Sequence, residues 1–316
     1  MVEQRTIRAK ACWTGIGLHS GQSIRMEILP APEDNGITFT RTDCPGHAEI
    51  RACVEHVVDT TMATSLGAGV NGSRATVGTV EHVLAALAGL GIDNARVYLD
   101  GPEVPIMDGS AKAFTEGLLH AGVERQNKPK RFLALKKEVT VQDGDKLARL
   151  SPGRGLHIQG SVDFDHPLIS TAPFKFEFSE QAFVQELAEA RTFGFLQDVE
   201  ALQANGLARG GSLDNAIVID RYRVLNPEGL RYSDEFVRHK ILDAIGDLSL
   251  VGLPVLGKLT LHRSGHALNT KLVDAVLNDP KAYEVVEAKP HRESAQSAEV
   301  REEAGFWLFE SAEGVA

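Results

Sequence analysis

The chain has 316 residues, of which 43% are hydrophobic and 24% charged, and its formal net charge is -10, values typical of a soluble globular protein with room for two domains. Lys and Arg are dispersed instead of clustered with aromatic residues, which argues against nucleic-acid binding, and no apolar run reaches the ~18 residues of a membrane span. The three cysteines lack C-x-x-C spacing, which excludes a sulfur-based zinc site and fits a reducing compartment, so we expect a cytoplasmic protein.

The first part of the chain is predicted to be rich in β-strands. Apolar and polar residues alternate in 24–29 and 36–41, with Pro, Gly and Asp between them, which is the pattern of half-buried strands. The glycine-rich loop Thr14–Gly21 nearly matches a dinucleotide-binding fingerprint, but its third glycine comes one residue late and no acidic strand end follows. We therefore predict a tight turn that presents His19.

A helix is predicted over 80–90, with Thr79 as its N-cap and Gly91 at its end. Its first turn carries Glu81 and His82, where the helix dipole favours the carboxylate. Taken alone, a Glu-His pair at this place is also the ordinary charged first turn of a helix. A strand, a loop and a second helix follow.

The polar, proline-bearing stretch 127–131 predicts a boundary between an N-terminal domain, 1–127, and a C-terminal domain, 128–285. Each half reads as strands, then helix, glycine, strand, loop and helix. This shared order predicts an α+β fold in which two domains of similar topology, each a sheet packed with helices, lie face to face. Residues 289–304 are charged and poor in apolar side chains, which predicts a loosely ordered tail over 286–316.

The longest predicted helix spans 234–251, with Ser233 as its N-cap and Gly252 at its end. Its apolar residues recur with the period of an amphipathic helix and predict a buried stripe. The residues of this stripe are Val237, Ile241, Ala244, Ile245 and Leu248.

A second stripe of the same helix carries candidate metal ligands. His239, Asp243 and Asp247 follow at intervals of four and share one helix face, while Lys240 points to the adjacent side. An imidazole and a carboxylate at this spacing can bind one divalent metal. Alternatively, the stripe is a solvated face with a His–Asp hydrogen bond. We favour the metal, because two similar domains packed face to face would bring His82 to the same interface.

These three ligands, His82, His239 and Asp243, are two imidazoles and one carboxylate. Catalytic zinc takes three protein ligands and leaves one position for water, although the same set suits iron(II). Such a metal lowers the pKa of bound water to about 7. Glu81, next in sequence to a ligand, is placed to accept the proton that the water loses.

A further group must stabilise the oxyanion or protonate the leaving amine. His266, predicted in a glycine-flanked loop, is the candidate, and Asp247 could hydrogen-bond its imidazole and hold it protonated. Taken alone, His266 is more often a loop residue that bonds to the backbone. Only the joint arrangement of these residues favours a metal site over such alternatives.

Six stretches of the chain carry a resemblance to a known family. They are Thr14–Gly21, Thr79–Asn94, Pro105–Ser110, Ala190–Phe195, Glu235–Asp247 and Ser264–Asn269. In this order they resemble the zinc-dependent UDP-3-O-acyl-N-acetylglucosamine deacetylases of lipid A (lipopolysaccharide) biosynthesis. The resemblance implies a small insert in each domain. The second insert would be a β-α-β unit at 192–220 that lines an apolar passage for the acyl chain of the substrate.

The resemblance also implies an activity, which is the hydrolysis of the N-acetyl group of acylated UDP-N-acetylglucosamine, with release of acetate, as an early committed step of that pathway. It implies one Zn2+ per chain, with Fe2+ as the alternative, on the three ligands above. The implied catalytic residues are Glu81 as general base, His266 as acid or oxyanion partner, Asp247 as its support and Thr192 as a hydrogen-bond donor to the tetrahedral intermediate. The implied substrate-binding residues are Lys240, His19, Phe193 and Phe195.

Two other functions stay open at this point. A catalytically silent binding protein for a sugar nucleotide or acyl lipid would be marked by the loss of a metal ligand or of Glu81, and all four residues are present. A zinc deacetylase for a different N-acetyl sugar would have no need of an apolar passage. In each case we expect a monomer without a nucleic-acid partner.

Overall fold

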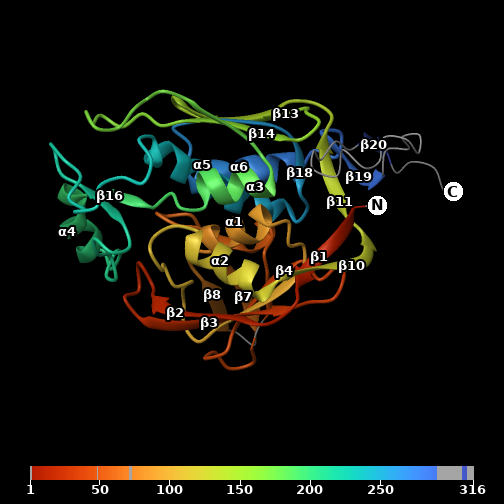
Figure 1. Cartoon of the computed structure of the whole chain (residues 1–316), viewed down its shortest axis with the longest axis horizontal. Helices are drawn as coiled ribbons and strands as arrows, with labels where there is room; N and C mark the ends of the chain where they lie inside the picture. Colours follow the sequence, from red (N-terminus) through yellow and green to blue (C-terminus); the bar gives the residue numbers. More distant parts are fainter. Residues whose placement is uncertain (1, 48, 71–72, 290–307, 312–316) are drawn as a thin grey trace.

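The computed structural model describes residues 2–47, 49–70, 73–289 and 308–311, and it stacks them in layers (Figure 1). A sheet from the first half forms one outer layer and a sheet from the second half the other, with the helices of both halves between them. This arrangement confirms the predicted α+β fold, in which each sheet is packed with helices. No helix within these ranges is both long and apolar enough to cross a bilayer.

The first half is built on a five-stranded sheet with the order β2-β3-β9-β4-β5. These strands are β2 (Ala11–Ile16), β3 (Ser23–Pro30), β9 (Ala95–Leu99), β4 (Ile37–Arg41) and β5 (Glu49–Arg51). Strands β4 and β9 are parallel and the other neighbours antiparallel. The alternation predicted for β3 buries Ile24, Met26 and Ile28 on one face. Helices α1 (Glu81–Gly89) and α2 (Lys112–Ala121) lie on the inner side of this sheet (Figure 1).

Two smaller β-structures and a short helix complete the first half. They are the three-stranded sheet β6 (Val57–Asp59), β7 (Ser65–Val70) and β8 (Ser73–Val77), the ribbon of β1 (Glu3–Ile7) with β10 (Val123–Pro129), and the 3-10 helix Val54–His56. The predicted domain boundary falls inside β10, and the limits of the two domains stay a prediction.

The second half is built on an eight-stranded sheet around β18 (Val255–His262), which runs parallel to β11 and β14 and antiparallel to β13. The other strands are β11 (Arg131–Leu135), β12 (Val139–Asp143), β13 (Lys146–Ser151), β14 (Leu156–Ser161), β15 (Phe174–Glu177), β19 (Tyr283–Lys289) and β20 (Leu308–Ser311). Its helices are α3 (Glu180–Ala182), a π-helix (Phe183–Leu187), α5 (Glu235–Leu248), a 3-10 helix (Ser249–Val251) and α6 (His266–Leu277). A separate unit of β16 (Phe193–Phe195), α4 (Leu196–Ala204) and β17 (Ile217–Ile219) projects from one end (Figure 1), with its two strands parallel.

Helices α1 and α5 pack against each other across the interface between the halves. A Cβ atom added to Gly246 of α5 would lie 2.1 Å from the carbonyl oxygen of Glu81, so the missing side chain lets the start of α1 approach α5 closely. Each helix is covered by its own sheet on one side and by the other helix on the opposite side. His239 and Asp243 are therefore only 1% and 2% exposed, and the alternative of a solvated face is wrong.

Helix starts differ from the sequence prediction in three places. Thr79 does not cap α1; its φ is 55° and its hydroxyl donates to Glu103 at 2.8 Å. Helix α5 begins after Asp234, so Ser233 is not its N-cap. His266 is the first residue of α6 and does not lie in a loop. At Thr79 a tertiary contact replaces the predicted cap, whereas the other two starts differ from the prediction by one or two residues, the usual spread for helix ends.

The expected loose tail lies partly outside the described residues. Residues 286–289 complete β19, and 308–311 form β20, which pairs antiparallel with it. The prediction of a loosely ordered segment is wrong for these two pieces, because their backbone groups join the ladder of the sheet. Residues 290–307 and 312–316 lie outside the described part.

Candidate active site

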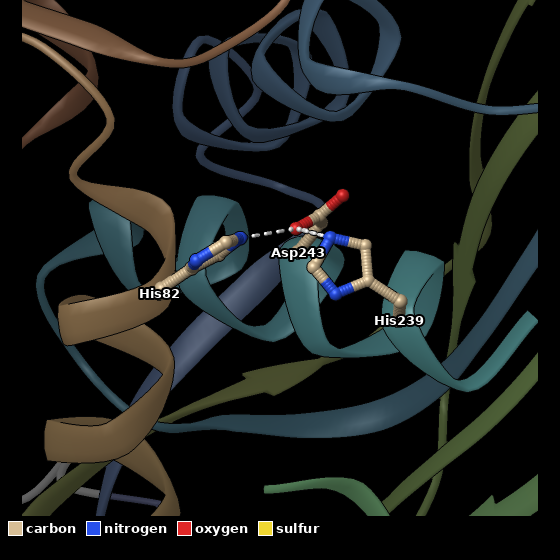
Figure 2. Close-up of side chains that lie close together, drawn as sticks. All are labelled: His82, His239 and Asp243. Atoms are coloured by element: carbon tan, nitrogen blue, oxygen red, sulfur yellow. Dashed lines mark ion pairs between the residues drawn. The ribbon is translucent and has the colours of Figure 1, made fainter. Parts of the chain in front are cut away.

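Three of the predicted site residues converge where α1 meets α5 (Figure 2). His82 Nε2 and His239 Nε2 lie 3.4 and 3.3 Å from Asp243 Oδ1, and one ligand atom of each residue lies within 4.8 Å of the others. Ligand atoms held 2.0–2.1 Å from one ion at tetrahedral angles stand about 3.3 Å apart. The two distances to Asp243 match this spacing.

The protonation states and hydrogen bonds of this cluster leave lone pairs available to bind a cation. His239 Nδ1 donates to the carbonyl of Ala190 at 3.0 Å, which leaves Nε2 unprotonated and directed at Asp243. Burial lowers the pKa of His239 to about 3, so the ring is neutral. Asp243 Oδ1 is buried and has no hydrogen-bond partner among the described residues, an arrangement that calls for an ion. The donor set therefore fits a divalent metal.

The second oxygen of Asp243 is held by Lys240. Lys240 Nζ donates to Asp243 Oδ2 at 2.7 Å, so the lysine folds back onto the cluster instead of pointing away to the adjacent side. Burial alone would raise the pKa of Asp243, but the Lys240 ammonium bonded to it holds that pKa well below its usual range. The carboxylate is therefore ionised, and its Oδ1 is available to coordinate a cation.

Glu81 lies beside the cluster and is 3% exposed. Its Oε2 accepts the backbone amide of Thr64 at 3.0 Å, and its Oε1 lies 3.9 Å from His266 Nε2. Burial raises the pKa of Glu81, while His266 and His82 oppose this rise. A buried carboxylate with a raised pKa is suited to accept a proton near neutral pH.

His266 faces Glu81 and the cluster from α6. Its Nε2 lies 3.9 Å from Asp243 Oδ2, and its Nδ1 donates to Asp247 Oδ2 at 3.0 Å. Burial opposes the charged ring, but Asp247 and Glu81 outweigh it and raise the pKa of His266 to about 9. At neutral pH the site thus holds an imidazolium at His266 and a neutral imidazole at His239, and the difference comes from the surroundings of the two rings.

Two aromatic residues of β16 connect the cluster with the projecting unit. The Phe193 ring lies 6.4 Å from the His239 ring and 5.0 Å from the Phe236 ring, centroid to centroid. Phe195 lies farther along the strand, against Phe164 at 5.6 Å. Phe193 therefore packs against a residue of the cluster, whereas the ring contacts of Phe195 are with Phe164 and His166.

Among the described residues, the hydrogen bonds of Thr192 and His19 are with residues outside the His82, His239 and Asp243 cluster. The amide of Thr192 donates to the carbonyl of Gly109 at 2.7 Å, and no hydrogen bond links its side chain to the cluster within the described residues. His19 Nδ1 accepts the amide of Ala208 at 3.3 Å, while its buried Nε2 has no partner in that part of the chain. Burial lowers the pKa of His19, with Glu103 opposing and His266 adding to this effect.

Several residues of the site escaped the sequence analysis. Thr64 Oγ1 donates to Asp247 Oδ1 at 2.6 Å, and Asn269 Nδ2 donates to Asp247 Oδ2 at 2.9 Å. Glu103 accepts the amides of His19 and Ser20 at 3.0 and 2.9 Å. No spacing in the sequence links these pairs, since they are between 22 and 183 residues apart. Only the position of Asn269, three residues after His266 on α6, was a usable signal.

A cavity of about 880 Å³ also lies between the halves, toward the other end of α1 and α5. Leu84, Leu87 and Leu248 line it, whereas the cluster of His82, His239 and Asp243 and residues 192–220 do not. It is therefore separate from the site, and the apolar passage predicted for 192–220 stays a prediction.

Comparison with known proteins agrees with this geometry. Residues 4–278 match the family LpxC, UDP-3-O-acyl N-acetylglycosamine deacetylase. Proteins named UDP-3-O-acyl-N-acetylglucosamine deacetylase are similar to it: one from Myxococcus xanthus is 55% identical over 90% of both chains, and one from Shewanella violacea is 47% identical over 97% of this chain and 100% of its own. A third, from Anaeromyxobacter sp. (strain Fw109-5), is 54% identical over 90% of this chain and 91% of its own. The chain therefore belongs to the UDP-3-O-acyl N-acetylglycosamine deacetylase family.

Proposed function

We propose that this protein hydrolyses the N-acetyl group of UDP-3-O-acyl-N-acetylglucosamine, releasing acetate and supplying an early committed step of lipid A biosynthesis. The observation that carries the proposal is the placement of a buried carboxylate, Glu81, and a cationic imidazole, His266, 3.9 Å apart at the edge of a His-His-Asp cluster. A proton acceptor and a proton donor beside a metal are what amide hydrolysis requires.

The metal is proposed to be one Zn2+ per chain, with Fe2+ as the alternative, bound by His82, His239 and Asp243. The spacing of these atoms, the neutral state of His239 and the free Asp243 oxygen support this assignment. When bound, a divalent metal would polarise the acetamide carbonyl and make water a better nucleophile. The ligand set leaves a position open for this chemistry, as in catalytic sites with three protein ligands.

The side chains would divide the proton transfers between them. The Glu81 carboxylate accepts a proton from the attacking water, and its backbone partner Thr64 fixes the orientation of the carboxylate. His266 donates a hydrogen bond from Nε2 to the developing oxyanion and then supports protonation of the leaving amine. Asp247 holds the His266 ring through Nδ1 and stabilises its positive charge. Thr192 is proposed as a further donor to the tetrahedral intermediate.

Substrate contacts are proposed for four more residues. Lys240 is cationic and near the cluster, which suits a contact with the sugar or its phosphates. His19 has a buried nitrogen free to bond a substrate oxygen. Phe193 and Phe195 offer apolar surface at the start of the 192–220 unit, which is proposed to hold the acyl chain. Cytoplasmic action is supported by the free state of the three cysteines. A monomer would suffice, because every proposed catalytic residue belongs to one chain.

The test is metal content per chain together with acetate release from the acylated UDP sugar and from its unacylated counterpart. We expect about one zinc per chain and turnover of the acylated substrate in clear preference to the other. Equal turnover of both would overturn the proposed substrate, and turnover unaffected by chelation would overturn the metal.

A further inference from the structure

Thr64 lies outside every motif of the sequence, yet all of its polar groups are bonded at the site. It is 0% exposed and directly precedes β7. Its amide donates to Glu81 Oε2 at 3.0 Å, its carbonyl accepts the amide of Val80 at 3.2 Å, and its hydroxyl donates to Asp247 Oδ1 at 2.6 Å. One residue therefore contacts both the proposed base and the partner of the proposed acid.

The hydroxyl of Thr64 has a task that no other described group can take. Asp247 is 0% exposed, and its Oδ2 already accepts His266 Nδ1 at 3.0 Å and Asn269 Nδ2 at 2.9 Å. Oδ1 receives its hydrogen bond from Thr64. Without that donor, the carboxylate would keep a buried, unpaired oxygen, and only the two bonds to Oδ2 would restrain its terminal torsion.

We propose that Thr64 is a positioning residue, which fixes the Asp247 carboxylate and thereby holds His266 in register with Glu81. The inference rests on the proposed function for the roles of Glu81 and His266. The hydroxyl bond joins residues 183 positions apart, one from each half of the chain. The acid and the base therefore reach their working geometry only when the two halves are correctly packed.

Substitutions at Thr64 can separate this role from packing. Thr64→Val keeps the shape and the backbone amide but removes the hydroxyl, whereas Thr64→Ser keeps the hydroxyl and removes a methyl group. The matched control is Thr115→Val, because Thr115 is also buried, at 2% exposure, and its hydroxyl donates to the carbonyl of Ala111, the residue before α2, instead of to a residue of the site.

We expect Thr64→Val to lower kcat by about 10- to 100-fold, the usual cost of losing a group that orients a catalytic residue, with KM and metal content unchanged. Thr64→Ser should restore most of the parental kcat, and Thr115→Val should retain it. A parental kcat in Thr64→Val would overturn the inference, and so would a Thr64→Ser variant as impaired as Thr64→Val, since packing would then be the cause.

A double-mutant cycle tests the route through Asp247. If the hydroxyl acts by fixing that carboxylate, Thr64→Val added to Asp247→Ala should cause no further loss of kcat. If the fold-losses of kcat in the two single variants instead multiply in the double variant, Thr64 acts by another route and the assignment is overturned.

A spectroscopic readout keeps the inference testable apart from the proposed activity. In histidine labelled with 15N, the Nδ1 proton of His266, identified by its absence in His266→Ala, reports the bond to Asp247. We expect Thr64→Val to shift this resonance and Thr115→Val to leave it in place. An unshifted resonance in Thr64→Val would overturn the positioning role even if the parent releases acetate. Conversely, if the parent releases no acetate but the resonance still shifts in Thr64→Val, only the proposed function would be overturned.

Discussion

Replacing Gly246 by alanine tests whether the approach of α1 to α5 creates the site. The added Cβ would lie 2.1 Å from the Glu81 carbonyl oxygen and within 2.9 Å of two further backbone atoms of Glu81. Real contacts of this kind are not shorter than 3.0 Å, so the start of α1 would have to withdraw by roughly 0.9 Å. Metal sites tolerate distance errors of only about 0.2 Å. The neighbouring residue His82 would therefore leave its place opposite Asp243.

Two quantities should change together in Gly246→Ala. In an unobstructed helix, alanine in place of glycine stabilises by about 0.8–1.0 kcal/mol, whereas a buried clash destabilises by about 1–3 kcal/mol. We expect the clash to prevail and the unfolding free energy to fall, because all three contacting atoms belong to the backbone of Glu81 and cannot move aside as a side chain could. Metal affinity should fall at least about tenfold.

The assays are denaturant unfolding and metal titration, with Gly69→Ala as control because a Cβ there meets no atom within 4 Å. A Gly246→Ala variant that is more stable than the parent, and binds metal equally well, would refute the claim that the helix contact positions His82. Destabilisation in Gly69→Ala of the same size would show that the effect is not specific to the contact.

Three further outcomes are expected. Glu81→Ala should keep its metal and fold but lose about 100- to 10,000-fold in kcat, as measured by acetate release beside elemental analysis; a variant near the parental rate would disprove its role as base. The kcat/KM of the parent should be constant below about pH 9 and should fall as the pH rises through that value, because His266 acts as a cation. Burial opposes its charge, but Asp247 and Glu81 raise its pKa to about 9. His266→Ala should be slow, should keep its metal, and should show no such fall of kcat/KM near pH 9. His239→Ala should contain less metal than the parent, and chelation of the parent should lower its Tm reversibly, so an unchanged Tm would argue against a metal at this cluster.

Local pattern was sufficient to predict much of the fold. The alternation in β3 and the apolar stripe of α5 follow directly from which residues must be buried, and both were confirmed. His239 and Asp243 were also within reach, because a separation of four residues places two side chains on one turn of a helix. The family resemblance supplied the residues whose roles no local pattern indicates, Thr192 and Lys240 among them.

What only the tertiary structure decided depends on contacts between residues far apart in the chain. Thr64 and Asp247 are separated by 183 residues, and nothing near either of them in sequence encodes the bond. The start of α1 was likewise decided from outside: the hydroxyl of Thr79 bonds to Glu103 instead of capping α1. The meeting of His82 with His239 and Asp243 is of the same kind. It requires that the two halves, whose separate helices and strands follow from local periodicity, pack together with Gly246 at their contact. That packing depends on the three-dimensional shapes of the two surfaces, which no local pattern of residues describes.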